Sequence, residues 1–384
     1  MAGCVPRRSL RNRILIALLP FAAGVFHLQD VVYRSIGKTS WGVPTHPPSV
    51  PMSEAVPYAP EFGYIHNRHG YCEFYRCWPA RGAVTRAVLV ALDGMGSYAK
   101  QFHPIGQFLA PRDIAFFGLD LQGQGLSEGP RSDWALLPQI VDGVADLLRY
   151  LEQRYPDTPI YLLGESIGGP LAMQLAARRD RPRNLAGLVV ASPELEPTRL
   201  STKGPWNAVG TVLRQIPYFL FASKAPSVNI AGRQKLVARG PEVYHRSIRD
   251  PLQNNCVTLR TLVASLALIA RSYELAKRTT IPTLVLQASC DKVNDPEAAA
   301  SLLTCLATGD KELVYFAGAA HGLFYDPDTP EVLRVIGDWL ESHLGRWQAP
   351  PEQCESLARI TTSVVPVPPR ESTSKETGRR KESR

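Results

Sequence analysis

Residues 159–179 read Pro-Ile-Tyr-Leu-Leu-Gly-Glu-Ser-Ile-Gly-Gly-Pro-Leu-Ala-Met-Gln-Leu-Ala-Ala-Arg-Arg, and they decide the fold. An apolar strand runs through the five residues 164–168 directly into a stretch of helix-forming residues. A sharp strand-to-helix turn at a serine leaves no space for side chains on the neighbouring residues. Gly164 and Gly168 have no side chain and therefore fit there. The turn lifts Ser166 above the sheet edge, where the free amides of the following helix face it. We therefore predict that Ser166 is a nucleophile for acyl transfer.

An activated serine needs a base and an acid that orients the base, and on such a turn they follow in the order Ser, Asp or Glu, His. Asp291 comes in the loop after the apolar strand 281–287, and His321 comes in a Gly-rich loop after a second strand, 312–316. Catalytic groups in open α/β sheets gather at the carboxyl ends of the strands. We therefore expect Ser166, Asp291 and His321 to meet at one edge of the sheet.

Two other acids compete with Asp291 for the role of orienting acid. Asp295 lies a few residues further on, and it is better suited to be the N-cap of the helix that we expect to start with Pro296. Glu194 follows the strand 186–191 and could reach the same histidine. We rank Asp291 first and Glu194 second.

An oxyanion hole needs two backbone N–H donors, one of them normally from the loop after an earlier strand. The apolar strand 87–92 opens into Asp-Gly-Met-Gly-Ser at residues 93–97, where the glycines allow the amides to turn inward. Met95 is our candidate for this donor, and Ile167, next to the nucleophile, is the other. The loop lacks a Lys-Ser or Lys-Thr pair and a Gly-x-Gly-x-x-Gly pattern, so we discount nucleotide binding.

Taken together, these motifs resemble the α/β-hydrolase superfamily. The strand-to-helix turn, the loop 93–97, the run 120–129, the Asp-Lys-Val-x-x-Pro segment that starts at Asp291, and His321 carry the resemblance. Within the superfamily they are most similar to the monoacylglycerol lipase and lysophospholipase group of serine aminopeptidase-like hydrolases. The similarity covers about residues 62–344.

The resemblance implies Ser166 as nucleophile, Asp291 as acid, His321 as base, and the amides of Met95 and Ile167 as the oxyanion hole. It implies cleavage of a carboxylic ester of a single-chain lipid through an acyl-enzyme, with no metal or organic cofactor. An aminopeptidase, a thioesterase or a short-chain esterase with the same triad is the alternative. A non-catalytic, membrane-tethered binding protein comes last, because the Ser, Asp and His are all present in order.

Two positions depart from the pattern of the relatives. They usually carry His-Gly where this chain has Asp93-Gly94, and many carry His in place of Glu165. A carboxylate beside the oxyanion loop would repel the developing negative charge if it pointed inward. In the alternative, Asp93 turns away and forms hydrogen bonds within its own loop.

The order of the elements predicts a single α/β domain over residues 61–346. Strands and helices alternate, which is typical of a mostly parallel sheet. The expected strands lie near Ala87, Ala115, Pro159, Ala186, Ile281 and Glu312, and the expected helices near Tyr98, Leu136, Ile167, Pro296 and Glu331. A long stretch at about 194–270 interrupts the alternation, and we interpret it as a partly helical cap. Its apolar residues serve either as the cap's own core or as a lipid-facing entrance: Trp206, Val209, Val212, Leu213, Ile216, Pro217, Tyr218, Phe219, Leu220 and Phe221.

The net charge of +8 lies mainly at the two ends of the chain. Residues 1–13 contain four arginines and no acid, and residues 365–384 contain six basic and three acidic residues. The core therefore has no basic excess that would indicate nucleic-acid binding. The oligomeric state stays open, and the seven cysteines, an odd number, do not identify the compartment.

The N-terminal segment suggests a link to a membrane. After the arginines come thirteen apolar residues, 14–26, a length that suits a signal peptide better than a full membrane span. We interpret residues 1–30 as a signal peptide or membrane anchor, 31–60 as a Pro-rich linker and 350–384 as a disordered basic tail. We therefore expect an enzyme that is membrane-associated or exported to the cell envelope, with a cytoplasmic location as the alternative.

Overall fold

The computed structural model describes residues 25, 60–134, 137–198, 227–348 and 365–366. The proposed signal or anchor, the linker and the basic tail therefore lie almost wholly outside the described residues, as do the ten apolar cap residues 206–221 named above. No helix in the described ranges is long and apolar enough to cross a lipid bilayer.

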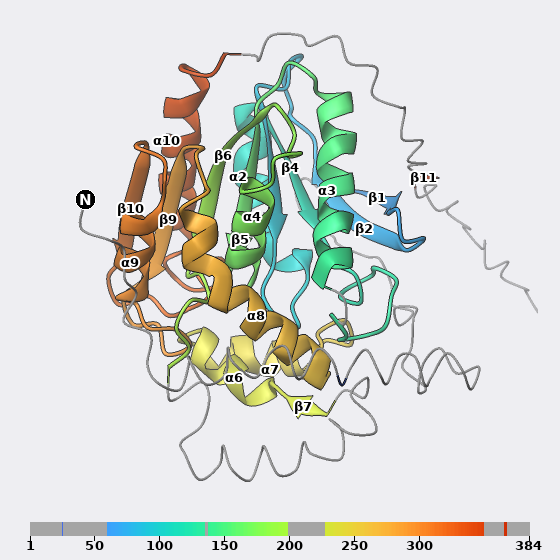
Figure 1. Ribbon diagram of the computed structural model, residues 1–384, viewed down its shortest axis with the longest axis vertical. Helices are drawn as coiled ribbons and strands as arrows, with labels where there is room; N and C mark the ends of the chain where they lie inside the picture. Colours follow the sequence, from blue (N-terminus) through green and yellow to red (C-terminus); the bar gives the residue numbers. More distant parts are fainter. Residues whose placement is uncertain (1–24, 26–59, 135–136, 199–226, 349–364, 367–384) are drawn as a thin grey trace, which may run out of the picture.

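A nine-stranded sheet forms the centre of the molecule, in the order β10-β9-β6-β5-β3-β4-β2-β1-β11 (Figure 1). The strands from β4 to β10 run parallel, while β1, β2 and β11 add antiparallel pairs at the other edge. This mostly parallel sheet confirms the predicted α/β-hydrolase fold. The strands are β1 (Glu61–His66), β2 (Cys72–Trp78), β3 (Ala87–Leu92), β4 (Ile114–Leu119), β5 (Ile160–Glu165), β6 (Leu185–Ala191), β9 (Thr283–Ala288), β10 (Lys311–Phe316) and β11 (Val365–Pro366).

Helices cover both faces of the sheet. The helices are η1 (Ala99–Phe102), α2 (His103–Leu109), η2 (Ala110–Arg112), α3 (Leu137–Arg154), α4 (Gly168–Ala176), α6 (Ala231–Val237), α7 (Pro241–Arg249), α8 (Leu259–Ala276), α9 (Ala298–Cys305) and α10 (Thr329–Leu344). In β3, Val88 and Val90 belong to one apolar cluster with residues of α3, α4, α8 and α9, whereas Leu89 belongs to a second cluster with residues of α2 and α10. The central strands are therefore buried on both faces, which explains their continuous apolar sequences.

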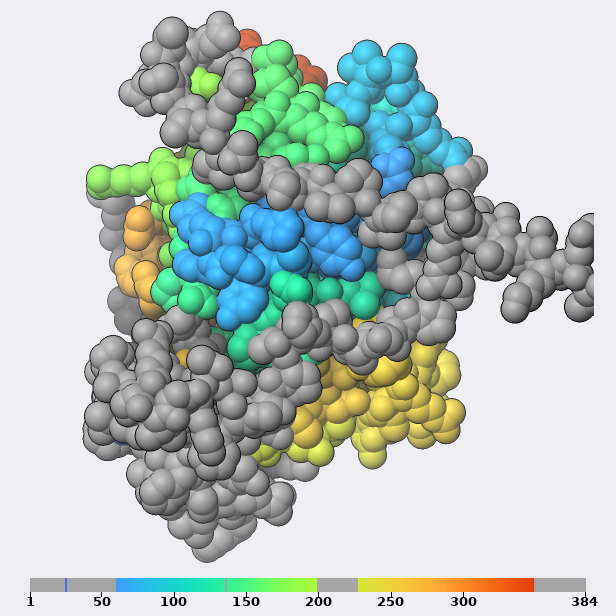
Figure 2. All heavy atoms as spheres, turned by 90° about the vertical axis from the view of Figure 1, so that its right-hand side faces the viewer, coloured from blue at the N-terminus to red at the C-terminus, as the bar shows by residue number. Residues whose placement is uncertain are grey.

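The segment between β6 and β9 contains the small helices α6 and α7 and the two-stranded sheet of β7 (Val228–Asn229) and β8 (Cys256–Val257). These elements lie at one end of the central sheet, at the bottom of Figure 1. Figure 2 shows the same region in yellow, along one side of the surface formed by β1 and β2. Helix α8 follows, and its Leu268 and Tyr273 pack into the main core. The helix runs past residue 270, where we placed the end of the cap.

Two helices begin later than the sequence predicted. α4 begins at Gly168 with Ile167 as its N-cap, and α9 begins at Ala298 rather than at Pro296. The N–H of Ala298 donates to the carbonyl of Asp295 at 3.1 Å, so a tighter turn precedes the α-helix. The prediction that Asp295 is the N-cap was therefore wrong, since that position is Glu297.

Candidate active site

The turn at Ser166 has the strained geometry that its sequence predicted. Ser166 has a backbone φ of 56°, in the left-handed region, directly after β5. A Cβ on Gly164 would lie 2.1 Å from the carbonyl oxygen of Gly168, and a Cβ on Gly168 would lie 2.5 Å from that of Leu92. Only glycine therefore fits on either side of the serine.

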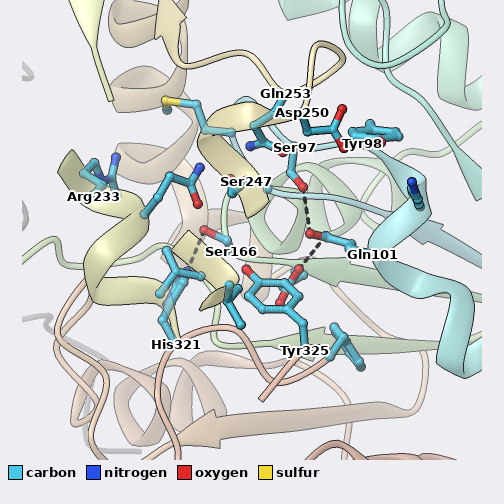
Figure 3. A pocket seen from close by; sticks show the side chains of 18 of the residues that line it. Ser97, Tyr98, Gln101, Ser166, Arg233, Ser247, Asp250, Gln253, His321 and Tyr325 are labelled. Atoms are coloured by element: carbon cyan, nitrogen blue, oxygen red, sulfur yellow. Dashed lines mark hydrogen bonds between the residues drawn. The ribbon is translucent and has the colours of Figure 1, made fainter. Parts of the chain in front are cut away.

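His321 connects the serine to Asp291. His321 Nε2 lies 3.0 Å from Ser166 Oγ, and His321 Nδ1 lies 2.7 Å from Asp291 Oδ2. The three residues follow β5, β9 and β10, three strands whose carboxyl ends meet at one edge of the sheet. Figure 3 shows Ser166 and His321 facing each other at the base of the cavity. This geometry suits proton transfer from a serine hydroxyl to an imidazole.

The acids around His321 stabilise the protonated form of its imidazole ring. Burial lowers the pKa of His321, but the charge and hydrogen bond of Asp291 outweigh burial, and the pKa is raised. Burial also opposes the charge on Asp291, yet the pKa of Asp291 is lowered because His321 and the N–H groups of Val293 and Asn294 stabilise the carboxylate. The lowered pKa favours a charged Asp291, which lies in hydrogen-bond contact with the ring of His321.

The two rival acids make other contacts. The carboxylate of Asp295 accepts from the N–H of Glu297 at 3.1 Å, near the start of α9. Glu194 Oε1 accepts from the guanidinium of Arg233 in α6 at 2.7 Å. Among these three acids, the structure pairs only Asp291 with His321.

The two candidate oxyanion donors flank the serine. Ile167 is the next residue in the chain and is fully buried. Gly94, before Met95, lies against the serine, because a Cβ on Gly94 would come 3.3 Å from Ser166 Cβ. Neither the Met95 nor the Ile167 amide donates to a backbone carbonyl within the described residues. The two amides therefore lie on chain segments next to Ser166, and their role as oxyanion donors stays a prediction.

Asp93 is a buried acid in this loop, and its surroundings oppose its ionisation. Its side chain is completely buried, and Oδ2 has no hydrogen-bond partner in the described part of the chain. Burial, together with the nearby acids Asp120 and Glu165, holds its pKa well above the usual value. The raised pKa favours the uncharged form of Asp93, the form that does not repel a negative charge on the substrate.

Asp120, the first residue after β4, has a structural role. It accepts hydrogen bonds from Arg76 at 2.9 Å, from the N–H of Ala99 at 2.9 Å and from the N–H of Leu126 at 2.8 Å. The hydroxyl of Ser127 donates to the Asp120 carbonyl and accepts from the N–H of Phe74. These contacts fasten the run 120–129 to β2 and to the start of η1.

A cavity of about 680 Å³ opens over Ser166. Its wall comes from the loop after β3, from η1 and α2, from the end of β5, from α6 and α7, and from the loop after β10 (Figure 3). Ser97, Gln101 and Tyr325 line it, and the sequence analysis did not single them out. The spacing of Ser97 and Gln101, about one helical turn, is visible in the sequence. The contact of Gln101 with Glu165 is not, because it joins residues far apart in the chain. No group of His, Cys, Asp and Glu side chains in the described residues has the arrangement of a metal site.

Comparisons with known proteins show the family of the chain. The family model described as serine aminopeptidase, S33, matches residues 83–328. Mouse (Mus musculus) monoglyceride lipase is 28% identical over 298 residues, which cover 75% of this chain and 93% of the mouse protein. A monoacylglycerol lipase of Mycolicibacterium smegmatis is 24% identical over 67% of this chain and 89% of its own length.

Solved structures give the same picture. The crystal structure of Paleococcus ferrophilus monoacylglycerol lipase is 25% identical, with a TM-score of 0.59, and the match covers 71% of this chain and 99% of that one. A soluble variant of Saccharomyces cerevisiae monoglyceride lipase shares the fold, with 18% identity, a TM-score of 0.65 and coverage of 76% and 97%. The chain belongs to the serine aminopeptidase S33 family of α/β-hydrolases and is a carboxylic-ester hydrolase.

Proposed function

We propose that this enzyme cleaves carboxylic esters of single-chain lipids, a monoacylglycerol or a lysophospholipid, through Ser166, His321 and Asp291. The observation that carries the proposal is the continuous contact from Asp291 to His321 to Ser166, at 2.7 and 3.0 Å, on the floor of a cavity of about 680 Å³. A cavity of that size takes up an acyl chain with a small head group. The lipases among the relatives support the substrate class.

The mechanism follows from these positions. Ser166 Oγ attacks the ester carbonyl carbon while His321 Nε2 accepts the hydroxyl proton. The amides of Met95 and Ile167 donate to the oxyanion, and each such donor contributes about 3 kcal/mol in other hydrolases. His321 then gives its proton to the leaving alcohol, which leaves an acyl-enzyme. Water attacks the acyl-enzyme by the same route and releases the fatty acid and free Ser166.

The test is fatty-acid release by the full chain with 1-monolauroylglycerol and with lysophosphatidylcholine, with Ser166→Ala in parallel. We expect turnover of at least one lipid by the wild type and loss of turnover in Ser166→Ala. The preferred lipid identifies a neutral or a charged head group. Wild-type protein that hydrolyses neither lipid overturns the lipase proposal and directs the search to thioesters, short esters and peptides.

Membrane association through residues 1–30 is a separate proposal, because these residues lie almost wholly outside the described part of the chain. It is supported by the thirteen apolar residues 14–26 that follow four arginines. Co-sedimentation of the full chain with anionic lipid vesicles tests it. Equal sedimentation of the full chain and of a chain lacking residues 1–30 would contradict it.

A further inference from the structure

The loop that carries Met95 lies directly against the inserted segment 228–257, which contains β7, α6, α7 and β8. A Cβ on Gly96 would come 2.5 Å from the carbonyl oxygen of Asn254, shortly before β8. The same Cβ would come 2.8 Å from Cδ1 of Ile230, the residue after β7. The small two-stranded sheet therefore leaves no space beside Gly96.

The loop itself is a tight turn. The N–H of Ser97 donates to the carbonyl of Gly94 at 3.2 Å, and Gly96 has a φ of 77°. These are features of a type II turn over residues 94–97, whose third residue needs a positive φ. Met95 is the second residue of this turn. A displacement of Gly96 would therefore also move Met95 and its N–H group.

Asn254 binds this turn and the core at the same time. Its backbone N–H donates to the carbonyl of Gly96 at 2.8 Å. In its side chain, Nδ2 donates to the carbonyl of Gly123 at 3.0 Å, and Oδ1 accepts from the buried guanidinium of Arg131 at 3.3 Å. Asn254 thus connects the turn to the run 120–129, which is fastened to the sheet.

On its other side, the turn is bonded to the strand that leads to the nucleophile. The hydroxyl of Ser97 donates to Gln101 Oε1 at 2.7 Å (Figure 3). Gln101 Nε2 donates in turn to Glu165, the last residue of β5, at 2.6 Å. The turn is therefore held from the core at Ser97 and from the inserted segment at Gly96.

We propose that Asn254 is a positioning residue for the oxyanion hole, because it holds Gly96 and thereby fixes the Met95 amide beside Ser166. This rests on the proposed hydrolysis at Ser166 and on the proposed role of the Met95 amide. A donor that is fixed before the reaction stabilises the transition state without reorganisation. Asn254 is not among the described residues that line the cavity, so its loss should lower kcat rather than weaken substrate binding.

Asn255 is the matched control, because it is the same residue type at the next position. Its Nδ2 donates to the carbonyl of Ile248 in α7 at 3.3 Å, and its carbonyl accepts from the N–H of Ile230 at 3.0 Å. Within the described residues, no hydrogen bond of Asn255 reaches the turn 94–97. Loss of its side chain therefore disturbs the inserted segment but leaves the bond between Asn254 and Gly96.

The experiment measures kcat and KM for propyl butyrate and propyl laurate, two esters that differ only in the length of the acyl chain. The full-length wild type is compared with Asn254→Ala, Asn254→Asp and Asn255→Ala. We expect kcat to fall about tenfold in Asn254→Ala, by the same factor for both esters and with little change in KM. Asn254→Asp should lose less, because it keeps an acceptor for Arg131. Asn255→Ala should keep the kcat of the wild type.

Inhibition by a long-chain trifluoromethyl ketone gives a second readout. Ser166 Oγ adds to the ketone carbon, His321 takes the hydroxyl proton, and the carbonyl oxygen becomes an oxyanion. No leaving group is involved, so the inhibition constant reports how well the oxyanion is bound. We expect this constant to rise in Asn254→Ala by about the factor by which kcat/KM falls, and to stay unchanged in Asn255→Ala.

Three results would overturn the assignment. They are an unchanged kcat in Asn254→Ala, an equal loss of kcat in Asn255→Ala, or a rise in KM alone. If Asn254→Ala does not fold, Asn254→Asp decides, and an unchanged kcat and inhibition constant in that variant overturn the assignment. Wild-type protein that hydrolyses neither ester contradicts the proposed function itself, whereas an active wild type with equally active Asn254 variants contradicts only the role of Asn254.

Discussion

Asp291 and Glu165 are two buried carboxyls close to His321, and they differ in how many donors surround them. Asp291 accepts from the imidazole of His321 and from two backbone N–H groups, and its pKa is lowered although burial opposes its charge. Glu165 accepts from one amide, and burial raises its pKa to about 7, against the attraction of His321. Burial alone therefore does not determine which acid is charged, because the donors decide it.

The same contrast separates Asp120 from Asp93 at the ends of the neighbouring strands β4 and β3. Burial raises the pKa of both, but Asp120 is held by Arg76 and two backbone amides. Asp93 Oδ2 has no partner in the described residues, and its pKa lies well above the usual value. Hydrogen-bond donors therefore oppose the effect of burial at Asp291 and Asp120, whereas Glu165 and Asp93 have fewer donors against it.

The largest effect is expected for Asp291→Asn. An amide does not hold His321 in the required tautomer or stabilise the imidazolium, so kcat on propyl laurate should fall about 10⁴-fold. Glu165→Gln, the same chemical change at the acid with fewer donors, should reduce kcat far less, because no hydrogen bond joins Glu165 to the ring of His321 within the described residues. Steady-state kinetics of both variants checks this. A small effect of Asp291→Asn together with a large effect of Glu194→Gln would transfer the role of orienting acid to Glu194.

The next largest effect concerns stability. Asp120→Ala leaves the buried guanidinium of Arg76 without its carboxylate, which should lower the free energy of unfolding by about 3–5 kcal/mol. Asp93→Asn replaces an acid whose Oδ2 has no hydrogen-bond partner in the described residues, and it should change the free energy of unfolding by a much smaller amount. Urea denaturation at neutral pH measures both values. Equal destabilisation by the two substitutions would mean that Asp93 is as firmly bonded as Asp120.

Glu165 should make the stability depend on pH. Its pKa rises from 4.5 in the unfolded chain to about 7 in the folded state, so the folded state resists ionisation. The contribution of Glu165 to stability is therefore fully present below about pH 4.5 and falls as the pH rises to about 7, by up to about 3 kcal/mol in total. The Glu165→Gln variant has no ionisable group at this position, so its unfolding free energy does not fall for this reason. The difference in unfolding free energy between the variant and the wild type should thus increase from about pH 5 to about pH 8, and a constant difference would refute the raised pKa.

The smallest effect is a shift of the pH profile. The hydrolysis needs neutral His321, whose pKa is raised, so kcat/KM should fall on acidification through a pKa above the usual 6.5. The charge of Glu165 contributes to that raised pKa. Its removal in Glu165→Gln should move the acid limb of the kcat/KM profile on propyl laurate to lower pH. A limb that stays in place or moves to higher pH would show that Glu165 does not raise the pKa of His321 through a negative charge.

Much of the fold could be predicted from local sequence. The apolar runs near Ala87, Pro159 and Ile281 are buried strands whose residues face helices on both sides of the sheet. They are easy to recognise because their apolar residues are continuous and do not alternate with polar ones. β1 was harder to predict, because it is a half-exposed strand at the antiparallel edge. The start of α9 was misplaced because Pro296 favours the first turn of any helix, whereas the chain makes a tighter turn there before Ala298.

Ser166 and the order of acid and base were predictable, because the strained turn requires glycines that the sequence displays and because loops after parallel strands converge. Gln101 and Ser97 were not, since each is an ordinary polar residue near a helix start. Their significance depends on contact with Glu165, which is 64 positions from Gln101 in the chain. No local pattern encodes such a pair.

By itself, the sequence determined the α/β order of elements and the identity of the serine turn, because backbone strain and strand burial restrict which residues are allowed locally. Only the tertiary structure decided which acid faces His321 and which carboxyls are charged. It placed Asp291 rather than Glu194 at 2.7 Å from the imidazole and left Glu165 and Asp93 with few donors. The physical reason is that a pKa and a hydrogen bond depend on neighbours in space, and those neighbours come from strands far apart in the chain.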